Sequence, residues 1–247
     1  MIIITADDYG KTRYATDSIV KCFSNKRITS ASAMVFMEDS ERAASLATQT
    51  SLEVGLHLNF TMPFSADKIP LKLREHQNKV VSYLTKNKLA QIICNPLLAD
   101  SFDFLFKSQV EEFIRLYGRQ PDFYNGHHHM HLCANVLIGR ILPRGARVRR
   151  TFTFYRGEKN PFNRLYRHIL GIVVSRQFIS TDSFFSILPI QNYERLRNIF
   201  HQAAGSNVEI EVHPENDEEI NFLLSDQYKR LMDSVQIGSF QKIKQRS

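Results

Sequence analysis

Short apolar runs alternate with stretches of helical periodicity along most of the 247-residue chain. The runs with the length and apolar content of buried strands are residues 2–5, 30–36, 54–59, 122–125, 146–149 and 208–212. Apolar positions recur at helical spacing over residues 13–25, 40–49, 102–117, 193–203 and 226–235. Residues 7–10 (Asp-Asp-Tyr-Gly) are predicted as a turn after the first strand. This alternation predicts an α/β fold, with a parallel sheet covered by helices.

The positions of the polar residues favour a barrel over an open sheet. Asp7 with Asp8, His57, Asn125 with His127, and His213 each lie at or near the carboxyl end of a different predicted strand. In a (β/α) barrel these ends share one rim and build the active site. We therefore expect a distorted, TIM-like (β/α) barrel that forms a single domain over residues 1–247. The pattern weakens over residues 61–100, where we expect a lid or rim insertion.

Composition narrows the class of protein. With 43% hydrophobic and 23% charged residues, the chain is not collagen-like, coiled-coil or disordered. Three widely separated cysteines argue against a disulfide scaffold or a cysteine-rich zinc site. Residues 2–4 are too short for a signal peptide, and the apolar run at 169–174 is too short to span a membrane. We expect a cytoplasmic protein without a transmembrane segment.

The net charge of +7 is concentrated in one segment. Residues 140–176 contain ten lysines and arginines, one acid (Glu158), and interleaved phenylalanines and tyrosines. This mixture suits an anionic partner such as a nucleic acid, a phosphorylated glycan carrier or a membrane surface. It suits a solvated basic face above core aromatics equally well. Both interpretations stay open at this stage.

Four histidines in five positions are the strongest chemical signal, in the stretch Asn125-Gly-His-His-His-Met-His131. In an extended segment His127, His129 and His131 would point to one side and His128 to the other. Imidazole is a common ligand of divalent transition metals, and the cluster is embedded between a predicted strand and the following chain. We expect at least one of these rings to bind a metal.

Three weaker signals accompany this cluster. The Asp7–Asp8 pair could bind a metal and position a water, or it could cap the following helix. His57 could be a ligand or a satisfied core residue. Alternation places Glu209, Glu211 and His213 on one side of a strand, although a His-Pro sequence also simply ends strands. Together they supply the parts of a metal-assisted hydrolase.

At this point the chain resembles a known family, the YdjC/ChbG-like carbohydrate deacetylases, which are distant relatives of the NodB-type polysaccharide deacetylases. The resemblance rests on five motifs in the family's order. They are residues 5–10 (Thr-Ala-Asp-Asp-Tyr-Gly), 55–59 (Gly-Leu-His-Leu-Asn), 125–131, 181–184 (Thr-Asp-Ser-Phe) and 211–214 (Glu-Val-His-Pro). The first three motifs together are specific, and the last two are loose.

The resemblance implies a role for each matching residue. Asp8, His57 and His127 would hold one divalent metal ion, Mg²⁺ or Zn²⁺. Asp7 would be the general base and His213 the general acid. Substrate-binding or supporting roles would fall to Asn59, Asn125, His129, His131, Arg149 and Asp182. The family usually has Asp where this chain has Asn125, so the amide here keeps the hydrogen bonding and removes a charge.

The resemblance also implies a function, the metal-dependent removal of acetyl groups from an N-acetylated sugar or glycoconjugate. An anionic or lipid-linked substrate would agree with the basic segment. Two alternatives stay open: a metal-dependent phosphoesterase or amidohydrolase on the same barrel, and a non-catalytic or weakly active protein that binds glycans or anionic ligands. No nucleic acid partner is expected, and a homodimer is left open.

Overall fold

The computed structural model describes residues 1–86, 88–155 and 157–244, whose contacts group them into two compact units. The first unit contains residues 1–7, 17–31 and the chain from 144 onward. The second contains residues 8–16 and 32–143. Each unit is therefore built from separated stretches of chain, and three of the crossings between them fall inside secondary-structure elements near the amino terminus. The expectation of a single domain over residues 1–247 stays a prediction.

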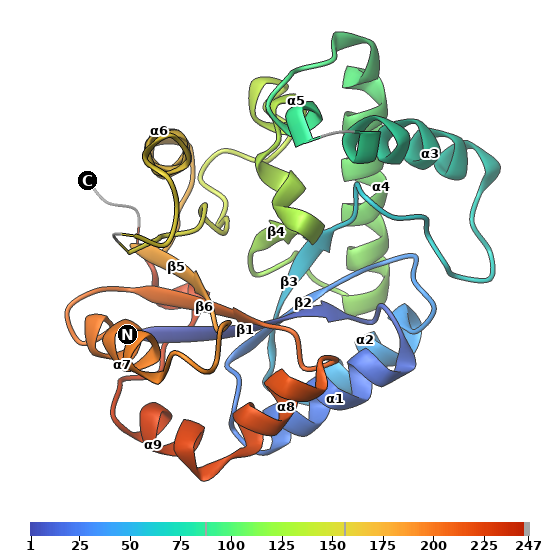
Figure 1. The fold of residues 1–247 in the computed structure, drawn as a ribbon. Coiled ribbons are helices and arrows are strands. Elements are labelled where there is room, and N and C mark those ends of the chain that lie inside the picture. The colour runs from blue at the N-terminus through green and yellow to red at the C-terminus, as the bar shows by residue number, and fades with distance from the viewer. Residues whose placement is uncertain (87, 156, 245–247) are drawn as a thin grey trace. The chain divides into compact units, whose positions relative to one another are not determined.

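The secondary structure alternates between strands and helices, as expected (Figure 1). The strands are β1 (Ile2–Tyr9), β2 (Ser30–Ala33), β3 (Glu53–Leu58), β4 (Tyr124–Gly126), β5 (Ser183–Ser186) and β6 (Val208–Val212). The helices are α1 (Arg13–Ser24), α2 (Ser40–Thr48), α3 (Leu71–Lys86), α4 (Ala99–Tyr117), α5 (Ala134–Ile138), α6 (Pro161–Gln177), α7 (Tyr193–Gln202), α8 (Asp217–Leu224) and α9 (Asp226–Asp233). Short 3₁₀ helices are η1 (Lys88–Gln91), η2 (Pro96–Leu98), η3 (His127–Leu132) and η4 (Phe240–Lys242).

The strands pair in the order β4-β3-β2-β1-β6-β5, and the pairs β1–β6, β5–β6 and β3–β4 are parallel. This confirms an α/β fold with a parallel sheet. The order ends at β4 on one side and at β5 on the other, so the described strands do not close into the expected TIM-like barrel. Residues 146–149, which we expected to form a strand, make only an isolated bridge between Arg147 and Ile179.

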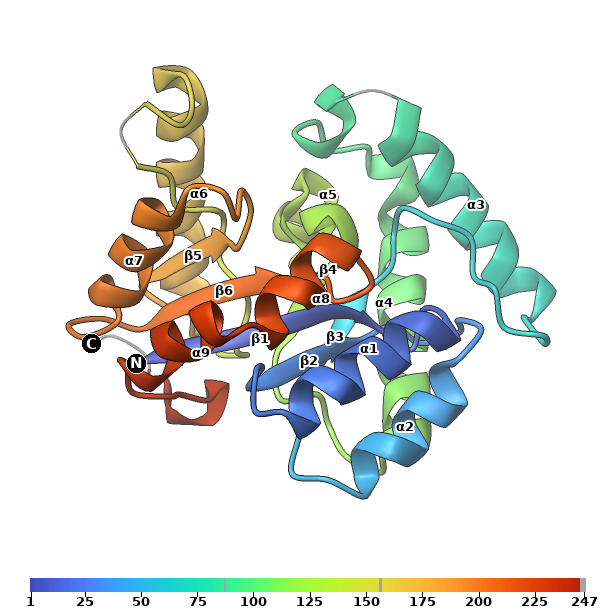
Figure 2. The same ribbon diagram turned by 60° about the horizontal axis from the view of Figure 1, so that its bottom comes forward.

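In the first unit β6 lies between β1 and β5 (Figure 2). The parallel register pairs Ile2 with Val208 and Ala6 with Val212. All eight residues of β1 and all five of β6 are buried, as expected for strands covered on both faces. Because Ala6 and Val212 are register partners, Asp7 and His213 follow them side by side at the carboxyl ends of the two strands.

The predicted turn at residues 7–10 is wrong, because β1 continues through Asp7 and Asp8 to Tyr9. The carbonyl of Tyr9 accepts the backbone N–H of Met34 at 2.8 Å, which extends the strand pairing past the two acids. The chain turns only at Gly10, where φ is +85° and a Cβ atom would lie 3.1 Å from the carbonyl oxygen of Met34. Glycine relieves both the conformational and the steric demand at this position.

In the second unit, the segment expected as an insertion at residues 61–100 contains the 16-residue helix α3. Leu73, Gln77, Val80 and Leu84 are its buried residues, and α3 packs along α4 (Figure 1). Their spacing of three or four positions is helical, but many polar residues and flanking prolines obscured it in the sequence. Whether this segment acts as a lid stays a prediction.

The histidine cluster is not extended. Residues 127–132 form η3, in which His128 and His129 take left-handed conformations with φ of 53° and 60°. The alternating orientation expected for His127, His129 and His131 is therefore wrong.

Among the helices of the described chain, none combines the length with the apolar character that crossing a lipid bilayer requires.

Candidate functional site

Asp8 is buried in the second unit and has an unusual backbone conformation. One of its carboxylate oxygens accepts no hydrogen bond from the described residues. Its φ is +67°, a strained value for a residue other than glycine and one that recurs at functional sites. Oδ2 accepts a hydrogen bond from Lys11 Nζ at 3.0 Å. Oδ1 is buried, has no hydrogen-bond partner among the described residues, and lies 3.4 Å from His57 Nε2. A buried carboxylate oxygen without a partner indicates a ligand that belongs there.

His57 is oriented by its register partner on the neighbouring strand. His57 on β3 pairs with Asn125 on β4, and His57 Nδ1 lies 2.8 Å from Asn125 Oδ1. The amide Nδ2 of Asn125 donates to Ser32 Oγ at 3.1 Å, so its oxygen is the atom that faces the ring. The ring therefore donates its proton from Nδ1, and Nε2 presents a lone pair toward Asp8 Oδ1. Two acceptors this close need a cation or a proton between them.

His127 joins the same group from the start of η3. Its ring stands edge-on to that of His57, with 5.9 Å between the ring centroids. Thr61 Oγ1 lies 2.7 Å from His127 Nδ1, so that nitrogen is occupied and Nε2 remains for another partner. Burial, reinforced by the neighbouring His57, lowers the pKa of His127 to about 3. The ring is therefore neutral near pH 7, which is the form that binds metals.

Asp8, His57 and His127 are residue types that bind divalent cations, but among the described residues the group whose ligand atoms all lie within 4.8 Å of one another is Asp7, Glu211 and His213, not these three. Burial tends to raise the pKa of Asp8, but His57, with smaller effects from His127 and Lys11, holds it below the usual range, so the carboxylate is ionised. The 3.4 Å between Asp8 Oδ1 and His57 Nε2 is the spacing of two ligands that each lie about 2.1 Å from one ion at a tetrahedral angle. One carboxylate with two imidazoles suits Zn²⁺ and tolerates Mg²⁺ or Mn²⁺.

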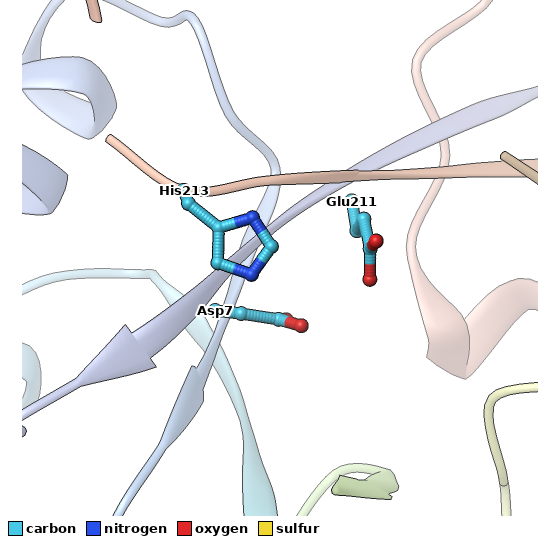
Figure 3. Close-up of side chains that lie close together, drawn as sticks. All are labelled: Asp7, Glu211 and His213. Carbon is cyan, nitrogen blue, oxygen red and sulfur yellow. The ribbon is translucent and has the colours of Figure 1, made fainter. Parts of the chain in front are cut away.

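A second cluster lies in the first unit, where Asp7, Glu211 and His213 converge from β1 and the end of β6 (Figure 3). One ligand atom from each of these residues lies within 4.8 Å of the others. Arg149 is fully buried beside them, and its Nη2 donates to Asp7 Oδ1 at 2.9 Å while Nη1 donates to Asp7 Oδ2. The guanidinium thus holds both oxygens of Asp7 in a fork, a geometry that fixes the carboxylate.

The same guanidinium faces two further carboxylates. Arg149 Nε donates to Glu209 Oε1 at 2.7 Å, and Nη1 lies 3.3 Å from Glu211 Oε2. Burial, together with repulsion from Asp7 and Glu209, raises the pKa of Glu211 well above its usual value despite the opposing effect of Arg149. Burial likewise raises the pKa of Glu209. The single positive charge of Arg149 therefore contacts three carboxylates. Because the pKa values of Glu209 and Glu211 are raised, the cluster holds a proton more readily than free glutamates do.

His213 is the more accessible member of the cluster, with 37% of its side chain exposed. Its backbone N–H donates to Glu219 Oε2 at 2.7 Å, and its Nδ1 lies 3.9 Å from Glu219 Oε1. Glu219 thus faces one side of the imidazole. This arrangement suits a group that delivers a proton to a ligand.

Among the described residues, Asp7, Glu211 and His213 are the ones whose ligand atoms lie close enough together to share an ion, so this cluster is a second candidate metal centre. The first-unit cluster already contains the Arg149 guanidinium, whose charge would repel a divalent cation beside Asp7. The second-unit cluster instead has an ionised carboxylate, whose Oδ1 accepts no hydrogen bond from the described residues, and the imidazole of His57 at 3.4 Å from that oxygen. The Asp8 oxygen therefore favours a metal at Asp8 and His57, with His127 beside them, whereas the spacing of the ligand atoms favours the first-unit cluster.

The remaining predicted residues have varied surroundings. Asn59 Oδ1 accepts the backbone N–H groups of Thr61 and Met62 at 3.2 and 3.0 Å, which shapes the loop that carries Thr61 to His127. His131 is buried and His129 is half-buried, with 6.5 Å between their ring centroids.

Asp182 precedes β5, where its carboxylate accepts the backbone N–H of Asn207 at 2.8 Å. Asn207 precedes β6, whereas His213 follows it, so Asp182 lies at the end of this strand pair opposite His213.

Sequence reasoning missed four residues that hold the others in place, which are Lys11, Ser32, Thr61 and Glu219. Each contacts a candidate ligand, its supporting amide or the candidate acid. Serine, threonine and lysine are common on any surface, and no spacing marked these as special. Only Glu219, six residues after His213, could have been suspected from its place just beyond the strand end.

The parallel sheet and the helices between its strands place the protein among the α/β proteins. The chain belongs to the YdjC-like protein family, whose family model matches residues 1–236.

Relatives of known name agree with this assignment. The chain is 32% identical over 137 residues to a chitooligosaccharide deacetylase of Proteus mirabilis and 29% identical over 136 residues to a carbohydrate deacetylase of Clostridium beijerinckii. In both comparisons the match spans 55% of this chain and 52% of the relative, so it covers about half of each relative's length.

A crystal structure from Enterococcus faecalis, provisionally described as a cellobiose-phosphate cleavage protein, has the same fold. It matches with a TM-score of 0.64 and 16% identity, and the match covers 97% of each chain.

Proposed function

We propose that this protein is a metal-dependent carbohydrate deacetylase that binds one divalent cation through Asp8, His57 and His127. The observation that carries the proposal is the buried, unpartnered Oδ1 of Asp8, which faces the lone pair of His57 Nε2 at 3.4 Å. The names of the relatives support the reaction class, because both act on acetylated carbohydrates by name. The substrate class is an N-acetylated amino sugar, oligosaccharide or glycoconjugate.

Amide hydrolysis defines what the site has to do. The carbonyl of an acetamide is a poor electrophile, and its nitrogen leaves only when it is protonated. A bound divalent cation would polarise the acetyl oxygen and lower the pKa of a nearby water. The chain itself orients the two rings for this, because Asn125 and Thr61 contact the Nδ1 atoms of His57 and His127 and leave the Nε2 atoms for another partner.

Asp7 is the residue best placed to take the proton from the attacking water. It immediately precedes Asp8 in the chain, so the base and the first metal ligand are joined by one peptide bond. Arg149 binds both of its oxygens, which prevents the carboxylate from turning and leaves lone pairs for a proton. General-base groups held in this way typically contribute about 10²–10⁴ to the rate.

His213 is the residue best placed to protonate the departing sugar nitrogen. Its ring is partly exposed, lies beside Asp7, and is faced by Glu219 on the Nδ1 side. The base and the acid thus come from adjacent strands whose register sets their spacing.

The test separates metal binding from proton transfer. Asp7→Asn and His213→Ala are expected to retain the metal, measured by elemental analysis, and to release acetate from N-acetylglucosamine oligomers about 10²–10⁴ times more slowly. His57→Ala is expected to lose the metal itself. The exposed residues Asp233 and His201 supply matched controls, Asp233→Asn and His201→Ala, which should behave as wild type.

Two outcomes would contradict the proposal. A near wild-type rate for Asp7→Asn with metal in excess would remove Asp7 as the base. Hydrolysis of aryl phosphates without acetate release from any N-acetylated sugar would replace the deacetylase with a phosphoesterase.

A further inference from the structure

A cavity of about 430 Å³ lies in the first unit between α6 and the segment 150–154. Its described lining residues include Arg150, Arg164, Arg167 and His168, and none of them is an aspartate or glutamate. Arg164, Arg167 and His168 belong to one face of α6, because residues three and four positions apart are neighbours on a helix. The proposed deacetylation uses none of these residues, although they form the centre of the basic segment.

Arg167 is held rigidly at this cavity. Its Nε donates to Asn163 Oδ1 at 2.9 Å and its Nη1 to Thr151 Oγ1 at 3.1 Å. The guanidinium carbon lies 5.5 Å from the ring centroid of Phe152 and 5.1 Å from that of Phe154. Two neutral hydrogen bonds and two aromatic rings therefore fix its plane, as in a preformed anion site.

The charge of Arg167 lacks a counter-ion. Burial lowers the pKa of Arg167, and within the described chain no carboxylate forms an ion pair with it. Its Nη2 atom has no protein acceptor among the same residues, so N–H donors remain for a ligand. A half-buried guanidinium without an acid is unfavourable unless an anion completes it. If the basic segment were only a solvated surface, the Arg167 guanidinium would be exposed to water rather than half-buried.

A glycine on α6, Gly171, allows this helix to pack closely against Arg150. A Cβ atom at Gly171 would lie 3.1 Å from Arg150 Nη2, so the glycine lets α6 pack against that side chain. Arg150 Nη1 in turn donates to the backbone carbonyl oxygens of Thr181 and Asp182. The cavity is therefore a built feature with fixed walls.

We propose that this cavity binds the phosphate group of an organic phosphate. Planar guanidinium groups pair with phosphate oxygens through two parallel hydrogen bonds, which a compact ammonium cannot do. The volume accommodates a phosphate together with a group the size of a sugar ring. Pro161, Leu165 and the phenylalanine rings supply the apolar walls for that group.

The phosphate could be carried by a soluble ester or by a phospholipid headgroup, and the two sources share this chemistry. The lipid source is worth testing because α6 also exposes Phe162, Ile169 and Ile172, with 85%, 54% and 39% of their surfaces accessible. The inference does not rest on the proposed deacetylation, and the two can fail separately.

The experiment compares Arg167→Gln with Arg176→Gln, an exposed arginine on the same helix that does not line the cavity. Calorimetric titration with glucose 6-phosphate is expected to show binding to wild type and to Arg176→Gln. Binding to Arg167→Gln is expected to be at least about tenfold weaker, because a charge-assisted contact is lost. Glucose, which lacks the phosphate, is the control ligand. Sedimentation with phosphatidylcholine vesicles, with and without phosphatidic acid, tests the lipid source in the same variants.

Binding of the soluble ester alone, or of phosphatidic acid vesicles alone, supports the cavity and identifies the source, provided that Arg167→Gln weakens it and Arg176→Gln does not. Equal losses in the two variants would show general charge attraction and overturn the proposal. Binding of neither probe, or equal binding of glucose, would overturn it as well. Acetate release from neutral oligomers should be the same in Arg167→Gln and wild type, which keeps this test independent of the proposed catalysis.

Discussion

Single atoms decide the chemistry of the candidate metal centre. The Nδ1 atoms of His57 and His127 are occupied by Asn125 and Thr61, and this leaves Nε2 as the coordinating atom on both rings. Asn125 is an amide, so its oxygen accepts the hydrogen bond from His57 without adding a charge. The strength of metal binding should therefore depend on this one side chain.

Replacing Asn125 should change metal affinity in two directions. Asn125→Leu removes the acceptor for His57 Nδ1–H and is expected to weaken metal binding about 10–100-fold. Asn125→Asp keeps an acceptor and adds a negative charge that makes His57 a better ligand, so binding should tighten. Calorimetric titration with Zn²⁺ measures both, and Asn198→Leu on the exposed face of α7 is the control. Unchanged affinity in Asn125→Leu would mean that this amide does not support a ligand.

Among the secondary-structure elements, the register of paired strands brings the side chains of both clusters together. The pairing of His57 with Asn125 places one hydrogen bond, and the pairing of Ala6 with Val212 places Asp7 beside His213. Gly55 on β3 maintains the first pairing, because the ring of Phe123 lies where its side chain would be. A shift of either register by one residue would turn these side chains to opposite faces.

Gly55→Ala should therefore damage the packing of β3 against β4. A Cβ atom there would lie 2.5 Å from a carbon of the Phe123 ring, a clash that the buried ring cannot avoid without moving the strand. The free energy of unfolding is expected to fall by about 1–3 kcal/mol, measured by urea denaturation. Gly205→Ala, where a Cβ atom meets nothing within 4 Å, is the matched control. Equal stability of the two variants would show that Phe123 has room to shift.

At the scale of the whole molecule, buried carboxylates link stability to pH. Burial raises the pKa values of Glu209, Glu211 and Glu219 above the ordinary value of 4.5. The folded protein therefore binds protons that the unfolded chain has already released, and its stability falls as the pH rises through the folded pKa values. Asp8 has the opposite shift, and its contribution is lost only as the pH falls toward its lowered pKa.

Glu211→Gln tests this dependence. The neutral amide cannot release a proton, so the free energy of unfolding should decline less steeply than in wild type as the pH rises above 4.5, the ordinary pKa of a glutamate. Urea denaturation at several pH values measures the slope, with the exposed Glu111→Gln as a control that should leave it unchanged. An identical slope in Glu211→Gln and wild type would show that Glu211 is ionised throughout this range.

The sequence by itself determined the alternation of strands and helices and the identity of the chemical groups. Helices near 13–24 and 40–48, and strands near 53–58 and 208–212, follow from periodicity, because that pattern depends on neighbours a few residues apart. The placement of His127 and His213 just after a strand was visible for the same reason. Asp7, Asp8 and His57 instead lie inside strands that are longer than expected or end after them.

Only the tertiary structure decided the rest. The described strands pair in a linear order and do not close into a barrel. In η3, His128 and His129 take left-handed conformations, and residues 71–86 form α3 although many polar residues obscure its periodicity. The tertiary structure also brought Arg149 onto Asp7, 142 positions away, and left one oxygen of Asp8 facing His57. Such contacts depend on strand register and close packing between segments far apart in the chain, which local periodicity does not encode.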